Sequence, residues 1–121
     1  MNLTFVETRV FSARWHRRQG DEALRELQNV LLGNPGAGDP IKGCGILRKL
    51  RFGDEGRQVG RRGGVRVIYL HTPGASRIDL LTVYGKDESE DLSADQVRVL
   101  CQLARSIRAE APVQKRKERR K

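Results

Sequence analysis

Three strand-like segments follow one another between residues 46 and 84, and the connections between them constrain the fold more than any other feature. The segments cover residues 46–52, 65–71 and 77–84, and they are rich in β-branched, aromatic and other apolar residues. A turn at residues 72–75 joins the last two, and a glycine-rich basic stretch at residues 53–64 joins the first two. Neither connection has room for the crossover helix that parallel neighbours need. We therefore predict an antiparallel meander.

The segments on either side of the meander complete the predicted order. Residues 3–7 suit a strand, residues 11–18 a short helix, and residues 21–32 an amphipathic helix that begins at the N-cap residue Asp21. A loop should follow as far as residue 43, and the capping-box pattern at residues 93–96 begins a last helix that ends near residue 108. The order β-α-α-β-β-β-α predicts an α+β domain with its helices packed on one face of a mainly antiparallel sheet.

The positive charge of the chain is concentrated in two places. The 121 residues are enough for one domain, which we assign to residues 1–110, with a disordered basic tail at residues 111–121. The net charge is +9, and residues 41–66 hold eight basic against two acidic side chains. Residues 115–121 hold six basic against one acidic side chain. Clustered cations of this kind favour a polyanionic partner such as RNA or DNA.

Several classes of protein are excluded by what the sequence does not contain. Apolar runs fall far short of the ~20 residues of a membrane span, and no leader resembles a signal peptide, so we expect a cytoplasmic protein without a membrane partner. Cys44 and Cys101 lie far apart, and we expect reduced thiols rather than a disulfide. Only His16 and His71 accompany them, so we expect neither a metal site nor another cofactor.

The strand at residues 46–52 carries the most informative pattern. Alternation places Ile46, Leu50 and Phe52 on one face, and Lys49 and Arg51 on the other. Two like charges on one strand face repel each other, so they need either full solvation or an anion between them. Both alternatives remain open at this point.

More basic residues are expected close to this strand. Arg48 falls on its apolar face, where we expect either an ion pair with Asp39 or Glu7 or a position near a sheet edge. Arg61, Arg62 and Arg66 lie in the following turn and at the start of the next strand. The predicted hairpin would bring Arg66 beside the strand that holds Lys49 and Arg51.

A mixed charged segment follows the third strand. Lys86 is followed by Asp87, Glu88, Glu90 and Asp91, just before the last helix. Carboxylates stabilise a helix N-terminus, which accounts for three of these acids. We hold Glu88 back as a possible proton acceptor. Among the other candidates, Trp15 is expected in the core, and His71 stays open because it ends a strand.

Three cations converging on one sheet face suit a phosphodiester better than a base edge. Arginine and lysine neutralise a phosphate and bind the additional charge of its pentacoordinate transition state. RNA supplies its own nucleophile, the 2′-hydroxyl, so a protein can cleave it without metal by aligning that group and handling two protons. The pattern therefore favours metal-free RNA cleavage.

An ordered series of segments resembles the RelE/ParE toxin superfamily, and within it the HigB-type toxins of type II toxin–antitoxin pairs. The segments read NPGAGDPIKG at residues 34–43, GILRKLR at 45–51, RRGGVRVIY at 61–69, LLTVYGKDE at 80–88 and DLS at 91–93. The resemblance implies a RelE-like fold over about residues 3–108. It also implies an endoribonuclease that cuts mRNA in the ribosomal A site. Its implied partner is a HigA-like helix-turn-helix antitoxin, through which alone it meets operator DNA.

The resemblance also implies roles for individual residues. Arg66 would bind the scissile phosphate, Lys49 and Arg51 would stabilise the transition state, and Lys86 or Glu88 would move the protons. The remaining cations would add contacts to mRNA and rRNA; they are Arg48, Arg61, Arg62, Lys115, Arg116 and Lys117. The chain departs from the RelE pattern at Leu92, which stands about where that branch has a catalytic tyrosine.

Two other functions are compatible with the same residues. A ParE-like protein inhibits DNA gyrase by binding and needs no convergent phosphate site. A basic RNA-binding module without activity would also carry clustered cations. The excess of basic residues between positions 41 and 66 favours cleavage over both.

Overall fold

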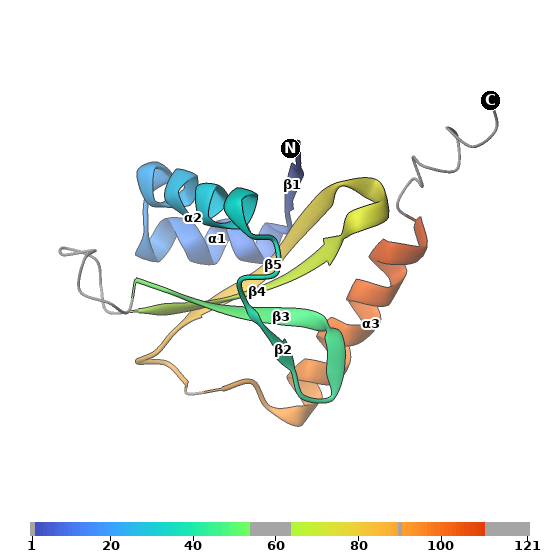
Figure 1. The fold of residues 1–121 in the computed structure, drawn as a ribbon. Helices are drawn as coiled ribbons and strands as arrows, with labels where there is room; N and C mark the ends of the chain where they lie inside the picture. The colour runs from blue at the N-terminus through green and yellow to red at the C-terminus, as the bar shows by residue number, and fades with distance from the viewer. Residues whose placement is uncertain (1, 54–63, 90, 111–121) are drawn as a thin grey trace.

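The computed structural model describes residues 2–53, 64–89 and 91–110 (Figure 1). The cations at positions 61 and 62 lie outside these residues, as does the whole of the predicted tail at 111–121, which includes Lys115, Arg116 and Lys117. The described part contains three α-helices and five strands: the three helices and four strands of the predicted order, and one strand, β2, that was not predicted. They are β1 (Thr4–Glu7), α1 (Arg9–Arg18), α2 (Asp21–Gly33), β2 (Asp39–Ile41), β3 (Cys44–Phe52), β4 (Val65–Thr72), β5 (Arg77–Gly85) and α3 (Ala94–Glu110).

The strands form one sheet in the order β1-β5-β4-β3-β2. The predicted meander is confirmed, because β3, β4 and β5 pair antiparallel in sequence order. β1 lies parallel to β5 at one edge, and β2 lies antiparallel to β3 at the other. β2 occupies a stretch that was predicted to be a loop. It spans three residues and contains Pro40, which sheets tolerate at an edge.

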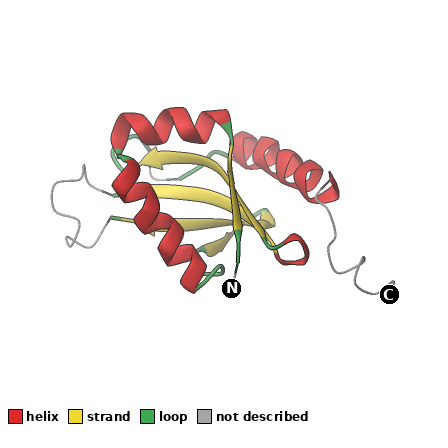
Figure 2. Cartoon of the chain, turned by 90° about the horizontal axis from the view of Figure 1, so that it is seen from above, coloured by secondary structure: helices red, strands yellow, loops and turns green. Residues whose placement is uncertain are grey.

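The fold class is confirmed as α+β, but the helices cover both faces of the sheet rather than one. α1 and α2 lie on one face and α3 lies on the other (Figure 1). In the view from above, α3 can be found as the helix from which the chain runs to the C-terminus (Figure 2). The other two α-helices in that view are α1 and α2. The reason lies in β4, where Val67 and Tyr69 enter the core under α1 and α2 while Ile68 and Leu70 enter the core under α3. A strand that is apolar on both faces needs cover on both.

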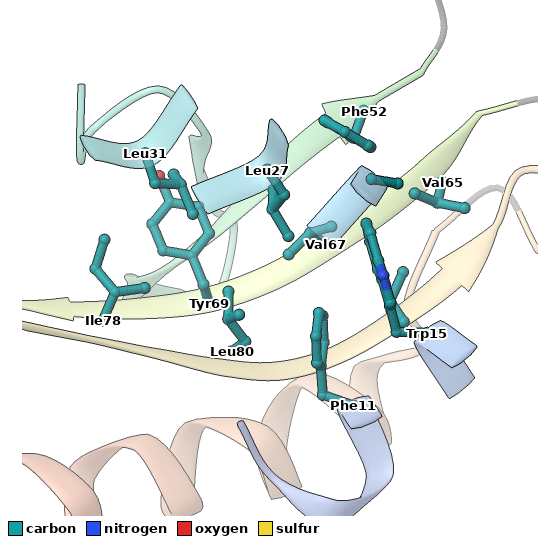
Figure 3. Packing of buried hydrophobic residues seen from close by; sticks show 12 residues of the cluster. Phe11, Trp15, Leu27, Leu31, Phe52, Val65, Val67, Tyr69, Ile78 and Leu80 are labelled. Carbon is teal, nitrogen blue, oxygen red and sulfur yellow. The ribbon is translucent and has the colours of Figure 1, made fainter. Parts of the chain in front are cut away.

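The core under α1 and α2 is built around aromatic side chains (Figure 3). Trp15 is fully buried, with ring centroids 5.5 Å from Phe11 and 5.8 Å from Phe52. Its indole N–H donates a hydrogen bond to the Gly20 carbonyl at 3.1 Å. The prediction that Trp15 is a core residue is therefore confirmed.

A disulfide between Cys44 and Cys101 ties the start of β3 to α3. The prediction of reduced thiols is wrong for this structure. Both cysteines belong to the core under α3, where strand pairing and helix packing bring together positions 57 residues apart. Spacing along the chain could not reveal this contact. Within the described ranges, no helix is long and apolar enough to cross a membrane.

Candidate functional site: a basic row under the third helix

Three neighbouring strands place Arg51, Arg66 and Tyr84 in one row across the sheet. Arg51 on β3 pairs with Arg66 on β4, and Arg66 pairs with Tyr84 on β5. Residues directly opposite each other in antiparallel strands lie about 5 Å apart at Cα and share a face. Tyr84 belongs to the core under α3, so the row lies on the α3 side of the sheet. The hairpin expected to bring Arg66 beside the basic strand is confirmed.

Tyr84 reaches this row because β5 carries an additional residue. The pairing of β4 with β5 shifts between Ile68 and Tyr69, so that Ile68 pairs with Thr82 while Tyr69 pairs with Leu80. Simple alternation from Leu80 would turn Tyr84 towards α1 and α2. The bulge instead turns Tyr84 towards α3 and opposite Arg66.

Lys49 extends the cluster by one further step along β3. It lies two residues before Arg51 and on the same side, as the strand pattern predicted. Its Nζ lies 3.1 Å from the Asp91 Oδ1, and its side chain is 18% exposed, whereas that of Asp91 is 69% exposed. The hydrogen bond from Lys49, followed by one from the Leu92 N–H, lowers the pKa of Asp91. Asp91 is thus an ionised counterion of the basic cluster rather than a helix-terminus residue.

The basic cluster (Lys49, Arg51 and Arg66) combines like charges at close range. Arg66 is only 8% exposed, and Arg51 stands directly opposite it. Like charges directly across a sheet are destabilising unless solvent or a negative charge compensates them. Arg66 is buried while Arg51 is exposed, so the row is solvated only in part.

Tyr84 is a site residue that sequence reasoning missed. It is 6% exposed, and its hydroxyl has no hydrogen-bond partner among the described residues. Burial, and after it the negative charge of Asp91, raises the pKa of the phenol, so the hydroxyl keeps its proton at neutral pH. An aromatic ending a predicted strand was the available signal, but the bulge that orients it is not readable from alternation.

A groove of about 730 Å³ extends from the basic cluster between β2, β3 and α3. Lys49, Arg51 and Asp91 line it, and so do Arg98 and Arg105 of α3. The two α3 arginines are seven residues apart and therefore lie on one helix face. That spacing could have identified them once α3 was known to cover the basic face. They extend the positive surface beyond the residues predicted.

Lys86 and Glu88, the two groups expected to move protons, have different surroundings. The Glu88 Oε1 accepts hydrogen bonds from the Gly85 N–H at 2.9 Å and from Arg14 Nη2 at 2.7 Å. The Gly85 N–H in particular lowers the pKa of Glu88. The Asp87 carboxylate forms a second ion pair with α1, in which its Oδ1 lies 2.6 Å from Arg18 Nη2. These contacts hold the segment after β5 against α1, while Lys86 has an exposed side chain.

Arg48 serves the fold rather than the basic cluster. It lies on the α1 and α2 face, opposite Tyr69, and its Nη1 donates to the carbonyls of Gly38 at 2.5 Å and Gly36 at 3.4 Å. Of the two expected alternatives, the position near a sheet edge is the one observed, because β3 lies beside the edge strand β2. The guanidinium contacts these backbone carbonyls instead of Asp39 or Glu7. A Cβ at Gly38 would stand 2.9 Å from the Lys49 carbonyl oxygen, so this loop passes β3 too closely for a side chain.

Ile46 lies apart from its expected neighbours, and His71, whose role the sequence left open, lies far from the basic cluster. Ile46 packs on the α3 side rather than with Leu50 and Phe52. His71 stands five residues after Arg66 on β4, about 16 Å away at the usual rise of a strand. Burial lowers the pKa of His71, which makes it a neutral group far from the basic cluster. In the described part of the chain, no three His, Cys, Asp or Glu side chains gather into a possible metal site.

Comparison with known proteins identifies the fold. No protein-family model matches the chain. Among solved structures, the chain is similar to an arginine-to-alanine double variant of the E. coli toxin RelE in its free state, with a TM-score of 0.52 and 16% sequence identity. The match covers 74% of this chain and 90% of that one. The chain therefore has a RelE-like fold.

Proposed function

We propose that this chain is the toxin of a type II toxin–antitoxin pair and that it cleaves mRNA on the ribosome. The observation that carries the proposal is the basic cluster: Lys49, Arg51 and Arg66 converge on one face of the sheet beside an open groove. The RelE-like fold supports the same class, because the similar structure is that of a toxin. The HigB-type resemblance of the sequence supports an antitoxin of the HigA-like, helix-turn-helix kind as the partner.

The proposed chemistry uses the 2′-hydroxyl of the RNA. The 2′-oxygen attacks phosphorus, the bond from phosphorus to the 5′-oxygen breaks, and a 2′,3′-cyclic phosphate remains. Arg66 binds the scissile phosphate, and Lys49 and Arg51 stabilise the additional negative charge of the transition state. A donor placed in this way contributes about 3–4 kcal/mol, or a factor of about 10²–10³ in rate. A metal ion is not part of this proposal.

Two protons must move in the same step, from the 2′-hydroxyl and to the 5′-oxygen. Glu88 has a lowered pKa and holds the Gly85 N–H and Arg14, so it is a weak base fixed in a structural contact. Lys86 has an exposed side chain, and its ammonium group makes no hydrogen bond or ion pair with the described residues. We therefore retain Lys86 as the candidate acid that protonates the leaving 5′-oxygen, while the proton of the 2′-hydroxyl passes to solvent water, and we assign Glu88 to positioning the segment after β5.

Mapping of mRNA ends after induction in bacteria tests the proposal. Expression of the parent chain should create new 5′ ends within translated codons and arrest growth. Arg66→Ala and Lys49→Ala should each reduce the number of such ends by about 10²–10³-fold. Arg25→Ala is the matched control, because it removes the same charge from an exposed position on α2. It should cleave like the parent chain.

The same experiment separates the alternative functions. Intact mRNA together with DNA damage would contradict cleavage and support the ParE-like inhibitor of gyrase. Intact mRNA with ribosome-bound protein and no DNA damage would support a non-catalytic RNA-binding module. Co-expression with the product of the neighbouring reading frame tests the antitoxin, which should co-purify with the chain and restore growth.

A further inference from the structure

The hydroxyl group of Tyr84 has no role in the cleavage chemistry proposed above, although it lies in the same row as Arg51 and Arg66. It is out of contact with solvent and has no hydrogen-bond partner among the described residues. Leaving a buried hydroxyl unpaired is unfavourable, and such groups are rare in native proteins. A phenylalanine would fill the same space without this penalty. The hydroxyl therefore calls for a partner that the described residues do not provide.

The neighbouring strand shows how this fold treats a tyrosine whose role is structural. Tyr69 on β4 points to the opposite face, under α1 and α2. Its hydroxyl donates to the Pro35 carbonyl at 2.7 Å and accepts from the Gly38 N–H at 3.0 Å. Tyr69 thus has both a donor and an acceptor partner. Of these two buried tyrosines, only Tyr84 lacks a hydrogen-bond partner among the described residues; the other buried side-chain atoms without one are Arg18 Nη1, Gln19 Nε2 and Thr72 Oγ1.

Charged groups around Tyr84 indicate what its partner is. Arg66 stands directly opposite. Asp91 lines a pocket between β5 and α3 together with Tyr84, and it also lines the groove that Lys49 and Arg51 share, so it stands where the two hollows meet. Among the described residues, the Asp91 carboxylate is an anion at this place, held by Lys49 at 3.1 Å. Because the Asp91 side chain is 69% exposed, it can swing away without disturbing the core. An RNA phosphate brings the same charge and additional acceptor oxygens.

We infer that an RNA phosphodiester replaces the Asp91 carboxylate beside Lys49 and accepts a hydrogen bond from the Tyr84 hydroxyl on a non-bridging oxygen. This inference rests on the proposed function and names the groups that form its phosphate site. Tyr84 is then a substrate-binding residue that contacts phosphate together with Arg66. Asp91 is a built-in competitor that closes the site until RNA arrives. Because burial keeps the phenol protonated at neutral pH, the hydroxyl is available as a donor.

The test compares Tyr84→Phe with Tyr69→Phe, which make the same chemical change on opposite faces. Two quantities are measured for each: kcat/KM for mRNA cleavage on programmed ribosomes, and Tm. Tyr84→Phe should lower kcat/KM by about 10–100-fold, the usual effect of losing a hydrogen bond to a charged group. Its Tm should be equal to or above that of the parent, because an unpaired buried hydroxyl is removed. Tyr69→Phe should keep kcat/KM within about twofold but lower Tm by about 4 °C or more.

A second measurement addresses Asp91 without requiring cleavage. Ribosomes carrying mRNA with a 2′-O-methyl group at the cleavage position bind the toxin without reaction. Asp91→Asn should bind this complex several-fold more tightly than the parent, and Tyr84→Phe should bind it more weakly.

Each outcome bears on the inference. Cleavage by Tyr84→Phe at the parental rate, or a loss of Tm that parallels its loss of activity, would overturn the role of Tyr84 and leave the proposed function intact. Weaker binding by Asp91→Asn would overturn the exchange of anions. A parent chain that does not cleave would instead overturn the proposed function, and this inference with it.

Discussion

The two faces of the sheet are covered by helices to different degrees. Under α1 and α2, the core is closed: Phe11, Trp15 and Leu27 are fully buried, and the polar atoms of Tyr69 and Trp15 have partners. Under α3, the core is apolar around Leu47 of β3 and Leu70 of β4. The opposite ends of these two strands carry the basic residues instead. There, Lys49 and Arg51 line a groove, and the Tyr84 hydroxyl in the same row has no hydrogen-bond partner within the part of the chain that the structure describes. One face therefore holds the fold, and part of the other is where we propose that the RNA phosphate binds.

Truncation of the closed face should have the largest effect on stability. Trp15→Ala removes a fully buried indole from the aromatic cluster, and changes of this kind cost about 3–5 kcal/mol. The free energy of unfolding in urea measures the loss. Lys49→Ala is the comparison from the other face, and it should cost less than about 1 kcal/mol because the partner of Lys49 is a largely exposed carboxylate. Equal losses would remove the distinction between the faces.

Removal of the disulfide should have the second largest effect on the stability of the protein. The bond closes a loop of 57 residues between β3 and α3, and bonds of this type stabilise by about 2–4 kcal/mol. The Cys44→Ser/Cys101→Ser double variant should therefore have a lower Tm than the oxidised parent. A thiol reductant should lower the Tm of the parent towards that of the variant and leave the variant itself unchanged. An equal effect of reductant on both proteins would contradict this account.

The ion pair of Asp91 with Lys49 should produce the smallest effect, visible as a dependence on pH. The pKa of Asp91 is lowered on folding, chiefly by the hydrogen bond from Lys49, so its ionised form stabilises the folded state. That contribution is fully present above the ordinary pKa of aspartate, about 3.9, and disappears as pH falls through the lower folded value. Because the carboxylate is mostly exposed, we expect only a few tenths of a kcal/mol. Asp91→Asn should differ from the parent at pH 6 and match it in strong acid.

Local patterns in the sequence were sufficient to predict most of the fold. Short connections determined the meander, and the capping box predicted the start of α3: the Gln96 N–H donates to Ser93 Oγ, and the Ser93 N–H donates to Gln96 Oε1. β2 was missed because a three-residue edge strand with a proline carries no periodic signal. The face of the sheet on which α3 packs was not predicted. The apolar residues on both faces of β4 indicate that helices cover both faces, but they do not indicate which helix covers which face.

The candidate site was predictable only in part, for a related reason. Lys49, Arg51 and Arg66 follow from alternation and hairpin pairing, both of which are local. Tyr84 depends on a one-residue bulge, and Cys44 meets Cys101 through tertiary packing. A one-residue change of register turns a side chain to the other face of a sheet, so strand pairing must be known before such a residue can be placed.

The most direct test of the central claim is the rate of a single round of mRNA cleavage on a programmed ribosome. The parent chain, Lys49→Ala and the control Arg25→Ala would be compared at saturating protein, with Tm measured on the same samples. We predict that Lys49→Ala cleaves about 10²–10³-fold more slowly than the parent at nearly the same Tm, while Arg25→Ala matches the parent in both. Cleavage by Lys49→Ala at the parental rate would contradict the assignment of the basic cluster to catalysis.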